Sequence, residues 1–182
     1  MSSETETTQT RQTIKEFDYI KRECGSCNEC CRGYLYGEAH GSPFFPGHPC
    51  HYLGMTSECA GCTIYPDRPA LCRDFVCGWL ASQQFPNWMK PELSKVIVFA
   101  RQFEDIEGEY LEPGEIMHWV SMVECGQKVD STVLSWVIQQ ARATNANLHY
   151  QVDKQDHYIG SPRFHDFVNK SGTHMYQTST SN

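Results

Sequence analysis

The sequence lacks the apolar segments that carry a chain into or across a membrane. Its first residues, MSSETETTQTRQT, are polar and contain none of the apolar core that a secretory signal peptide needs. No apolar run approaches the roughly 18 residues that span a bilayer. We therefore expect a cytoplasmic protein without a membrane partner. Thiols stay reduced in the cytoplasm, so a dense cysteine cluster there favours metal binding over disulfide formation.

Positive charge and the common enzyme motifs are also scarce. The formal net charge is −7, whereas nucleic-acid-binding surfaces are usually basic, so we expect no nucleic-acid partner. There is no P-loop, no G-x-G-x-x-G, no nucleophile elbow and no H-E-x-x-H. The best-known signatures of nucleotide binding and hydrolysis are therefore missing, and the chemistry must be sought elsewhere.

Cysteine, by contrast, is abundant and concentrated. Nine of the ten cysteines lie between residues 24 and 77, several of them in C-x2-C pairs. Two intervening residues allow both sulfurs to reach one metal, and soft thiolates suit zinc and iron–sulfur clusters. A structural zinc takes four such ligands at about 2.3 Å. The candidate ligands are Cys24, Cys27, Cys30, Cys31, Cys50, Cys59, Cys62, Cys72 and Cys77.

The number of thiols leaves the nuclearity open. One zinc cannot use nine ligands, whereas two four-thiolate zinc sites need eight. One iron–sulfur cluster with spare thiols, or a polynuclear centre, also accounts for them. The run C-x2-C-x2-C resembles the first ligands of bacterial ferredoxins. Cys31 follows that run at once and no proline comes next, which argues against ferredoxin-like electron transfer.

Two cysteines in a predicted helix give a sharper expectation. Cys72 and Cys77 are five residues apart, and in a regular helix their side chains would point about 140° from each other. We expect them either to serve different metals or to lie in a distorted turn. Cys125 stands alone in the sequence and is expected to be a buried thiol.

Charged and imidazole side chains near the cysteines are weaker candidates. Arg68 and Arg73 are expected to screen thiolate charge. The loop histidines His40, His48 and His51 could replace a thiol as ligand, but loop histidines are more often exposed to solvent.

The periodicity of the chain predicts an α+β fold. We expect a small cysteine-rich metal-binding lobe with little regular structure and one or two helices, followed by a small mixed α/β lobe. The expected boundaries are a disordered tail at 1–15, the cysteine-rich lobe at 16–91, the α+β lobe at 92–168 and a second disordered tail at 169–182. The expected helices are 69–83 and 130–143, and the expected strands are 94–100, 116–124, 147–153 and 156–160.

Several segments resemble a known family. CGSCNECC (24–31), PCHYL (49–53), GCTIYPDRPALCRDFVC (61–77) and Trp79 are similar to the CxxCxxCC family, the YkgJ-like proteins described as zinc- or iron-chelating. The resemblance covers about residues 24–80. It implies metal binding by the family's ligand-like positions, which are Cys24, Cys27, Cys30, Cys31, Cys50, Cys62, Cys72 and Cys77. Cys59 is an addition to that pattern.

Three functions follow from these observations. The first is a metal-binding protein that holds zinc or iron, a 4Fe–4S cluster included, through its cysteines. The second is an iron–sulfur or multinuclear iron enzyme. A similar cysteine box occurs in flagellin lysine methylases, which implies S-adenosylmethionine as cofactor and a protein as substrate or partner. The third is a metal storage or delivery protein.

Overall fold

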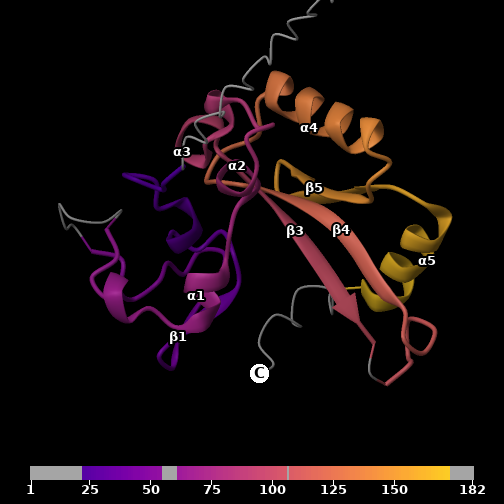
Figure 1. Ribbon diagram of the computed structural model, residues 1–182, viewed down its shortest axis with the longest axis horizontal. Coiled ribbons are helices and arrows are strands. Elements are labelled where there is room, and N and C mark those ends of the chain that lie inside the picture. The colour runs from indigo at the N-terminus through magenta and orange to yellow at the C-terminus, as the bar shows by residue number, and fades with distance from the viewer. Residues whose placement is uncertain (1–21, 55–60, 106, 173–182) are drawn as a thin grey trace, which may run out of the picture.

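The computed structural model describes residues 22–54, 61–105 and 107–172, and these form an α+β fold (Figure 1). The helices are α1 (Ala70–Asp74), α2 (Gly78–Ala81), α3 (Pro91–Ser94), α4 (Ser131–Ala143) and α5 (Pro162–Ser171). The strands are β1 (Gly37–Ala39), β2 (Ser42–Phe44), β3 (Val96–Glu104), β4 (Ile116–Glu124), β5 (Leu148–Val152) and β6 (Gln155–Ile159). Short 3₁₀ helices cover Glu29–Cys31, Tyr65–Asp67 and Asn87–Met89. The expected tail at 1–15 lies outside the described residues.

One mixed sheet organises the second half of the chain. Its strand order is β3-β4-β5-β6; β3 and β4 are antiparallel, β4 and β5 parallel, and β5 and β6 antiparallel. Helix α4 makes the crossover that a parallel β4–β5 pair requires. The predicted strand 116–124, the strand pair at 147–153 and 156–160, and the helix 130–143 are confirmed to within two residues. The predicted strand 94–100 begins at Val96 and continues to Glu104.

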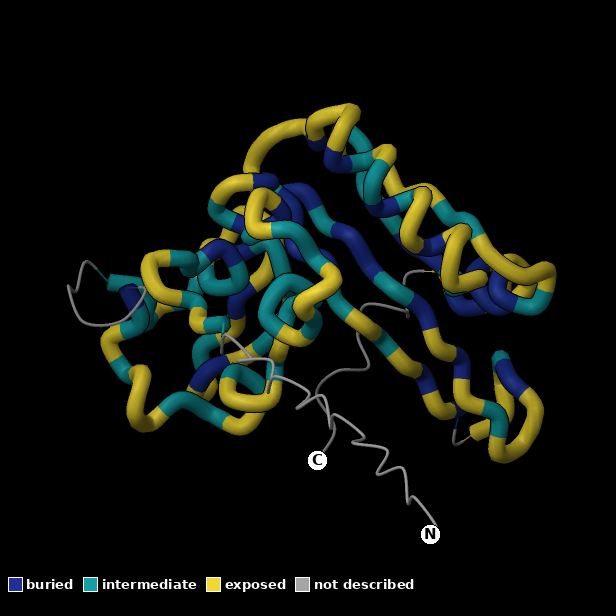
Figure 2. The backbone as a smooth tube through the Cα atoms, turned by 45° about the horizontal axis from the view of Figure 1, so that its top comes forward, coloured by how far each residue is buried: buried dark blue, intermediate teal, exposed yellow. Residues whose placement is uncertain are grey.

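Each face of the sheet is covered by a different helix, because successive side chains of a strand point to opposite faces. Val98 and Met122 face α4 and pack against Val133 and Val137 of that helix. Phe103, Met117 and Trp119 belong to the other face and pack against α5. Figure 2 shows buried residues along the strands and exposed ones on the outside of α4. The sheet is therefore the middle layer of a hydrophobic core.

Helix α5 corrects the expected boundary of the C-terminal tail. The helix continues to Ser171, so residues 169–171 are helical instead of part of a tail, and 173–182 lie outside the described residues. Ser161 caps the helix by accepting a hydrogen bond from the backbone N–H of Phe164, and Pro162 occupies the first turn. Phe164 and Phe167 are fully buried against Trp119, which fixes the helix on the sheet.

The cysteine-bearing region, which we define as residues 22–54 and 61–81, has short elements. It contains the β1–β2 hairpin, α1 and α2, and it lies beside the edge strand β3 in Figure 1. The predicted helix 69–83 is wrong as a continuous element: the chain leaves α1 at Phe75, whose backbone is extended, and re-enters a helix at Gly78. The ring of Phe75 packs against that of Phe99 on β3 (5.6 Å between centroids). The helix is thus interrupted at the residue whose side chain packs on the sheet.

Side chains join the cysteine-bearing region to the remainder of the molecule. The guanidinium of Arg22 donates hydrogen bonds to the carbonyl oxygens of Trp79, Ser82 and Phe85 at 2.6–2.7 Å. The carboxylate of Glu29, which is buried, accepts from the ammonium of Lys95 at 3.1 Å. These contacts hold the two regions together. Among the helices in the described ranges, none is both long and apolar enough to cross a membrane.

Candidate metal centre

The eight cysteines assigned by the resemblance lie in turns, loop segments and short helices. Each is half-buried and forms no disulfide. Cys30 and Cys31 lie in the 3₁₀ helix, Cys72 lies in α1, and Cys77 is the residue before the first turn of α2. Cys59 lies outside the described residues. Cys125 is buried at the end of β4, as expected, with 4% of its surface exposed.

The first cysteine group is shaped by two consecutive turns. The backbone N–H of Cys27 donates to the carbonyl of Cys24 (3.0 Å), and the N–H of Cys31 donates to the carbonyl of Asn28 (2.9 Å). Gly25 takes a positive φ of 56° in the first turn, a conformation that favours glycine. The sequence CGSCNECC thus folds into two turns. It does not form an α-helix, in which Cys24, Cys27 and Cys31 would lie on one face.

Backbone hydrogen bonds bring two distant cysteines to this group. The N–H of Cys50 donates to the carbonyl of Cys31 (2.9 Å), and the N–H of Leu53 donates to the carbonyl of Cys50 (3.0 Å). Leu53 forms an antiparallel bridge with Cys62. The positions of Cys31, Cys50 and Cys62 are therefore connected through the main chain.

The thiols of Cys30 and Cys31 are in contact. Their Sγ atoms lie 3.8 Å apart, and two thiolates on one tetrahedral zinc would be separated by about the same distance, roughly 3.8 Å, for bonds of about 2.3 Å. The hydrogen bond from the Cys30 thiol lowers the pKa of Cys31 to about 7 and raises the pKa of Cys30. Cys31 thus loses its proton more readily than Cys30.

Burial favours the protonated form of four further thiols. Desolvation raises the pKa values of Cys24, Cys27, Cys72 and Cys77 above that of a free cysteine. A thiol must lose its proton to bind a metal, and the cation then supplies the charge that stabilises the thiolate. Burial therefore disfavours the unligated thiolate form of these four cysteines, and a bound cation would stabilise that form.

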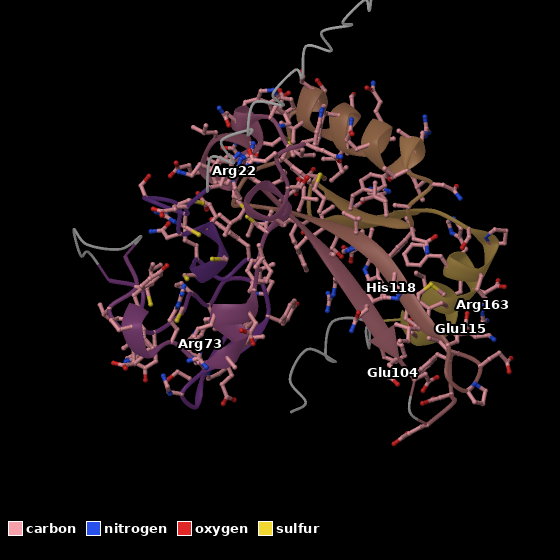
Figure 3. All side chains as sticks on the ribbon, in the orientation of Figure 1. Arg22, Arg73, Glu104, Glu115, His118 and Arg163 are labelled. Atoms are coloured by element: carbon pink, nitrogen blue, oxygen red, sulfur yellow. The ribbon has the colours of Figure 1, made fainter. Side chains whose placement is uncertain are left out.

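Of the two arginines expected to screen thiolate charge, Arg68 is the one whose charge acts on the thiols. Its charge lowers the pKa values of Cys24 and Cys31 after larger effects from burial and the Cys30 hydrogen bond. The Nε of Arg68 is buried and has no hydrogen-bond partner among the described residues, so it retains a donor for a thiolate. Arg73 is exposed beside α1 (Figure 3) and donates to the backbone carbonyl of Arg68. Only the first of the two arginines expected to screen charge is in position to do so.

The loop histidines are exposed and engaged in other contacts. His40 Nε2 lies 2.9 Å from the carbonyl oxygen of Asp67, the ring of His48 stacks on Phe45, and that of His51 packs edge-on against Tyr52. Nothing in these contacts directs an imidazole toward the thiols.

The donor set fits a thiophilic metal in kind and in number. Eight reduced thiols share one region with a buried arginine donor. Within the described part of the chain, however, no three side chains of His, Cys, Asp or Glu meet at the spacing of metal ligands. The backbone contacts connect Cys31, Cys50 and Cys62 through the main chain.

A second polar cluster, which the sequence patterns do not indicate, lies inside the sheet. Ser121 Oγ lies 3.3 Å from Nδ1 of His149, whose Nε2 lies 2.8 Å from Asp156 Oδ1. These are the residue types of a nucleophilic triad, but Ser121 and His149 are each 1% exposed. Ser121 also accepts a hydrogen bond from the indole of Trp119. Because no substrate can reach the hydroxyl, we assign the cluster to the core.

Comparisons with protein families, with curated proteins and with solved structures found no match for this chain.

Proposed function

We propose that this chain is a metal-binding protein of the CxxCxxCC type, which coordinates zinc or iron through its cysteine cluster. The proposed ligands are Cys24, Cys27, Cys30, Cys31, Cys50, Cys62, Cys72 and Cys77. The observation that carries the proposal is the concentration of eight half-buried cysteines, none of them in a disulfide, in the cysteine-bearing region. In a reducing cytoplasm, such thiols would remain available to a metal.

The composition of the core supports a structural role for the metal. Among the described residues before position 82, Ala39 and Phe44 are the buried apolar side chains, whereas the buried apolar residues from Met89 onward form two clusters. A region with so little apolar burial needs another source of free energy to stay ordered. A structural zinc contributes on the order of 10–16 kcal/mol, which is enough to provide it.

Elemental analysis combined with an absorption spectrum tests the proposal. The full chain is purified anaerobically with a reductant, and zinc and iron are counted per chain. Stoichiometric zinc in a colourless protein supports a structural zinc site. A visible absorption band with stoichiometric iron supports an iron–sulfur centre, and S-adenosylmethionine binding is then the next measurement for the methylase alternative.

A matched pair of variants makes the test specific. Cys72→Ala removes a proposed ligand, and Cys125→Ala removes a thiol outside the proposed set; the first should lower the metal content and the second should not. A reduced chain that is folded throughout and contains neither zinc nor iron, even after anaerobic incubation with each metal, would contradict the proposal.

A further inference from the structure

A cavity lies between the sheet and the C-terminal half of α4, the helix that covers one face of the sheet (Figure 1). Val133, Val137 and Ala141 follow one another at intervals of four residues and form the buried face of this helix. The two valines fill the space above the sheet, but Ala141 has only a methyl group, and Ala146, just after the helix, is equally small. A volume of about 150 Å³ therefore stays open beside these two alanines.

The floor of the cavity is apolar and one of its sides is aromatic. Val98 of β3, Val120 of β4 and Leu148 of β5 form the floor. The rings of Phe85 and Trp136 also line the cavity, and they meet with their centroids 5.1 Å apart and their planes at 62°. We call these two rings the aromatic corner. Aromatic rings prefer edge-to-face and offset-stacked contacts, so a corner of this kind favours a third ring over an aliphatic group.

The aromatic corner is held in place by contacts outside the cavity. The ring of Phe85 packs against Gly78 of α2, where a Cβ atom would lie 2.6 Å from it. The guanidinium of Arg22 donates a hydrogen bond to the carbonyl oxygen of Phe85 at 2.6 Å. The ring of Trp88 packs edge-on against Trp136, with 5.8 Å between centroids. The corner is thus formed before any ligand arrives, as is usual for small-molecule sites.

The rim of the cavity is polar but uncharged. Gln84, Gln140 and Thr144 line the cavity and are exposed to solvent. No Asp, Glu, Lys or Arg belongs to the described residues that line it. Side-chain amides both donate and accept hydrogen bonds, so they suit a neutral polar group. A charged group above an apolar floor would lose hydration without gaining a partner of opposite charge.

We propose that this cavity binds a small neutral molecule through a single aromatic ring, with the ring on the aromatic corner and a polar substituent at the rim. An apolar cavity of about 150 Å³ is large enough for one six-membered aromatic ring. The described residues that line the cavity include no cysteine. The site therefore goes beyond the proposed function and does not depend on a bound metal.

Titration of the full chain with three probes of similar size tests the site. The protein is labelled with ¹⁵N in its tryptophans, and the indole resonances are followed by NMR at pH 7. Phenol should shift the resonance of Trp136 until saturation, with a Kd on the order of 1 mM, a value that a ligand of this size can reach. The resonance of Trp119, which packs on the other face of the sheet, should not move.

The two other probes test the chemistry of the ligand. Benzoate carries a charge, and cyclohexanol has no aromatic ring, so each should bind about 10-fold more weakly than phenol. Equal binding of benzoate or of cyclohexanol would overturn the proposal. So would a phenol shift at Trp136 that grows without saturation, or no shift at all.

A matched pair of substitutions tests the location. Ala146→Leu fills the cavity, whereas Ala143→Leu adds the same side chain at an exposed position of α4 that does not line it. The first should abolish the phenol shift of Trp136, and the second should retain it. Val120→Phe fills the cavity from β4 and is a second, independent variant; helical circular dichroism identifies which variants fold. Unchanged phenol affinity in a folded Ala146→Leu or Val120→Phe variant would overturn the proposal.

Metal content measured in the same samples separates this site from the proposed function. Zinc and iron per chain should be equal in the wild type and in all folded variants. A chain that binds phenol at Trp136 and no metal would contradict the proposed function and leave the site standing. A chain that binds metal but shows no saturable phenol shift would do the reverse.

Discussion

The cysteine-bearing region holds eight half-buried thiols, and its longest described helix, α1, has five residues. Residues 89–105 and 107–172, the sheet region, hold two apolar clusters and a helix of 13 residues, α4. The first region is gathered by turns and by individual backbone hydrogen bonds, and the second by burial of apolar side chains on both faces of a sheet. The contrast indicates that the two regions depend on different sources of stability, and the following predictions test it.

Metal removal should have the largest effect, and it should be confined to one region. If the proposed metal supplies the folding free energy of this region, a strong chelator should increase the exchange rates of backbone amides around Cys50, Cys62 and α1 by on the order of 100-fold or more. Amides of β3 and β4 should keep their protection. Hydrogen exchange followed by mass spectrometry measures both; equal loss of protection in the two regions would break the contrast.

Truncation of a core aromatic side chain should destabilise the sheet region and leave the metal content of the cysteine-bearing region unchanged. Phe167 is fully buried between Phe103 and Trp119, and Phe167→Ala should lower the free energy of unfolding by about 3–5 kcal/mol. Urea unfolding followed by circular dichroism measures this change. The matched control is Leu93→Ala, at a site 63% exposed, which should change stability by no more than about 0.5 kcal/mol. Metal content should be the same in both variants under native conditions.

The ion pair between the regions should have an intermediate effect. Lys95→Met leaves the buried carboxylate of Glu29 without its ammonium partner, at a cost of about 1–2 kcal/mol, since Lys95 itself is partly exposed. We expect the urea midpoint for metal release to fall more than the midpoint for loss of helical signal. Lys95→Arg retains the charge and should behave as the wild type. If both midpoints shift together in Lys95→Met, the two regions unfold as one unit.

A surface ion pair should give the smallest effect, visible as a pH dependence. Arg163 donates to Glu115, on the opposite side of the molecule from Arg73 (Figure 3), and this hydrogen bond lowers the pKa of the Glu115 carboxyl. The pKa of Glu115 in the folded state lies below its value in the unfolded chain, which is about 4.3. The ion pair therefore contributes to stability above pH 4.3, and this contribution is lost as the pH falls through the folded-state pKa of Glu115. Urea midpoints of the wild type and Glu115→Gln should differ at pH 7 and converge in acid. A constant difference across that range would exclude this ion pair as the cause.

Sequence patterns predicted the sheet region well, because its elements are long and periodic. Strand 116–124 and helix 130–143 alternate apolar and polar residues at the periods of a strand and a helix, and the structure has them at the expected positions. Helix α5 also has a readable signal, since Ser161 and Pro162 precede Phe164, Phe167 and Val168 at helical spacing. The tail expected at 169–182 therefore begins inside this helix.

The same patterns failed where the chain is short of apolar residues. Leu71, Phe75 and Trp79 recur at helical spacing and predict one helix, but the structure has two, because Phe75 turns out of α1 to pack on Phe99. Gly78 allows this arrangement: a Cβ at that position would lie 2.6 Å from the ring of Phe85. Such contacts join residues far apart in sequence and leave no local signal.

The sequence by itself determined the chemical character of this protein: thiols concentrated between residues 24 and 77, and a periodic second half that could bury a core. Local spacing encodes which residue types are present and how neighbouring side chains are oriented, so it was sufficient for both. The tertiary structure alone decided which thiols are neighbours, which arginine accompanies them and where α1 ends. These relations depend on hydrogen bonds and packing between segments distant in sequence, such as those joining Cys31 to Cys50 and Phe75 to Phe99.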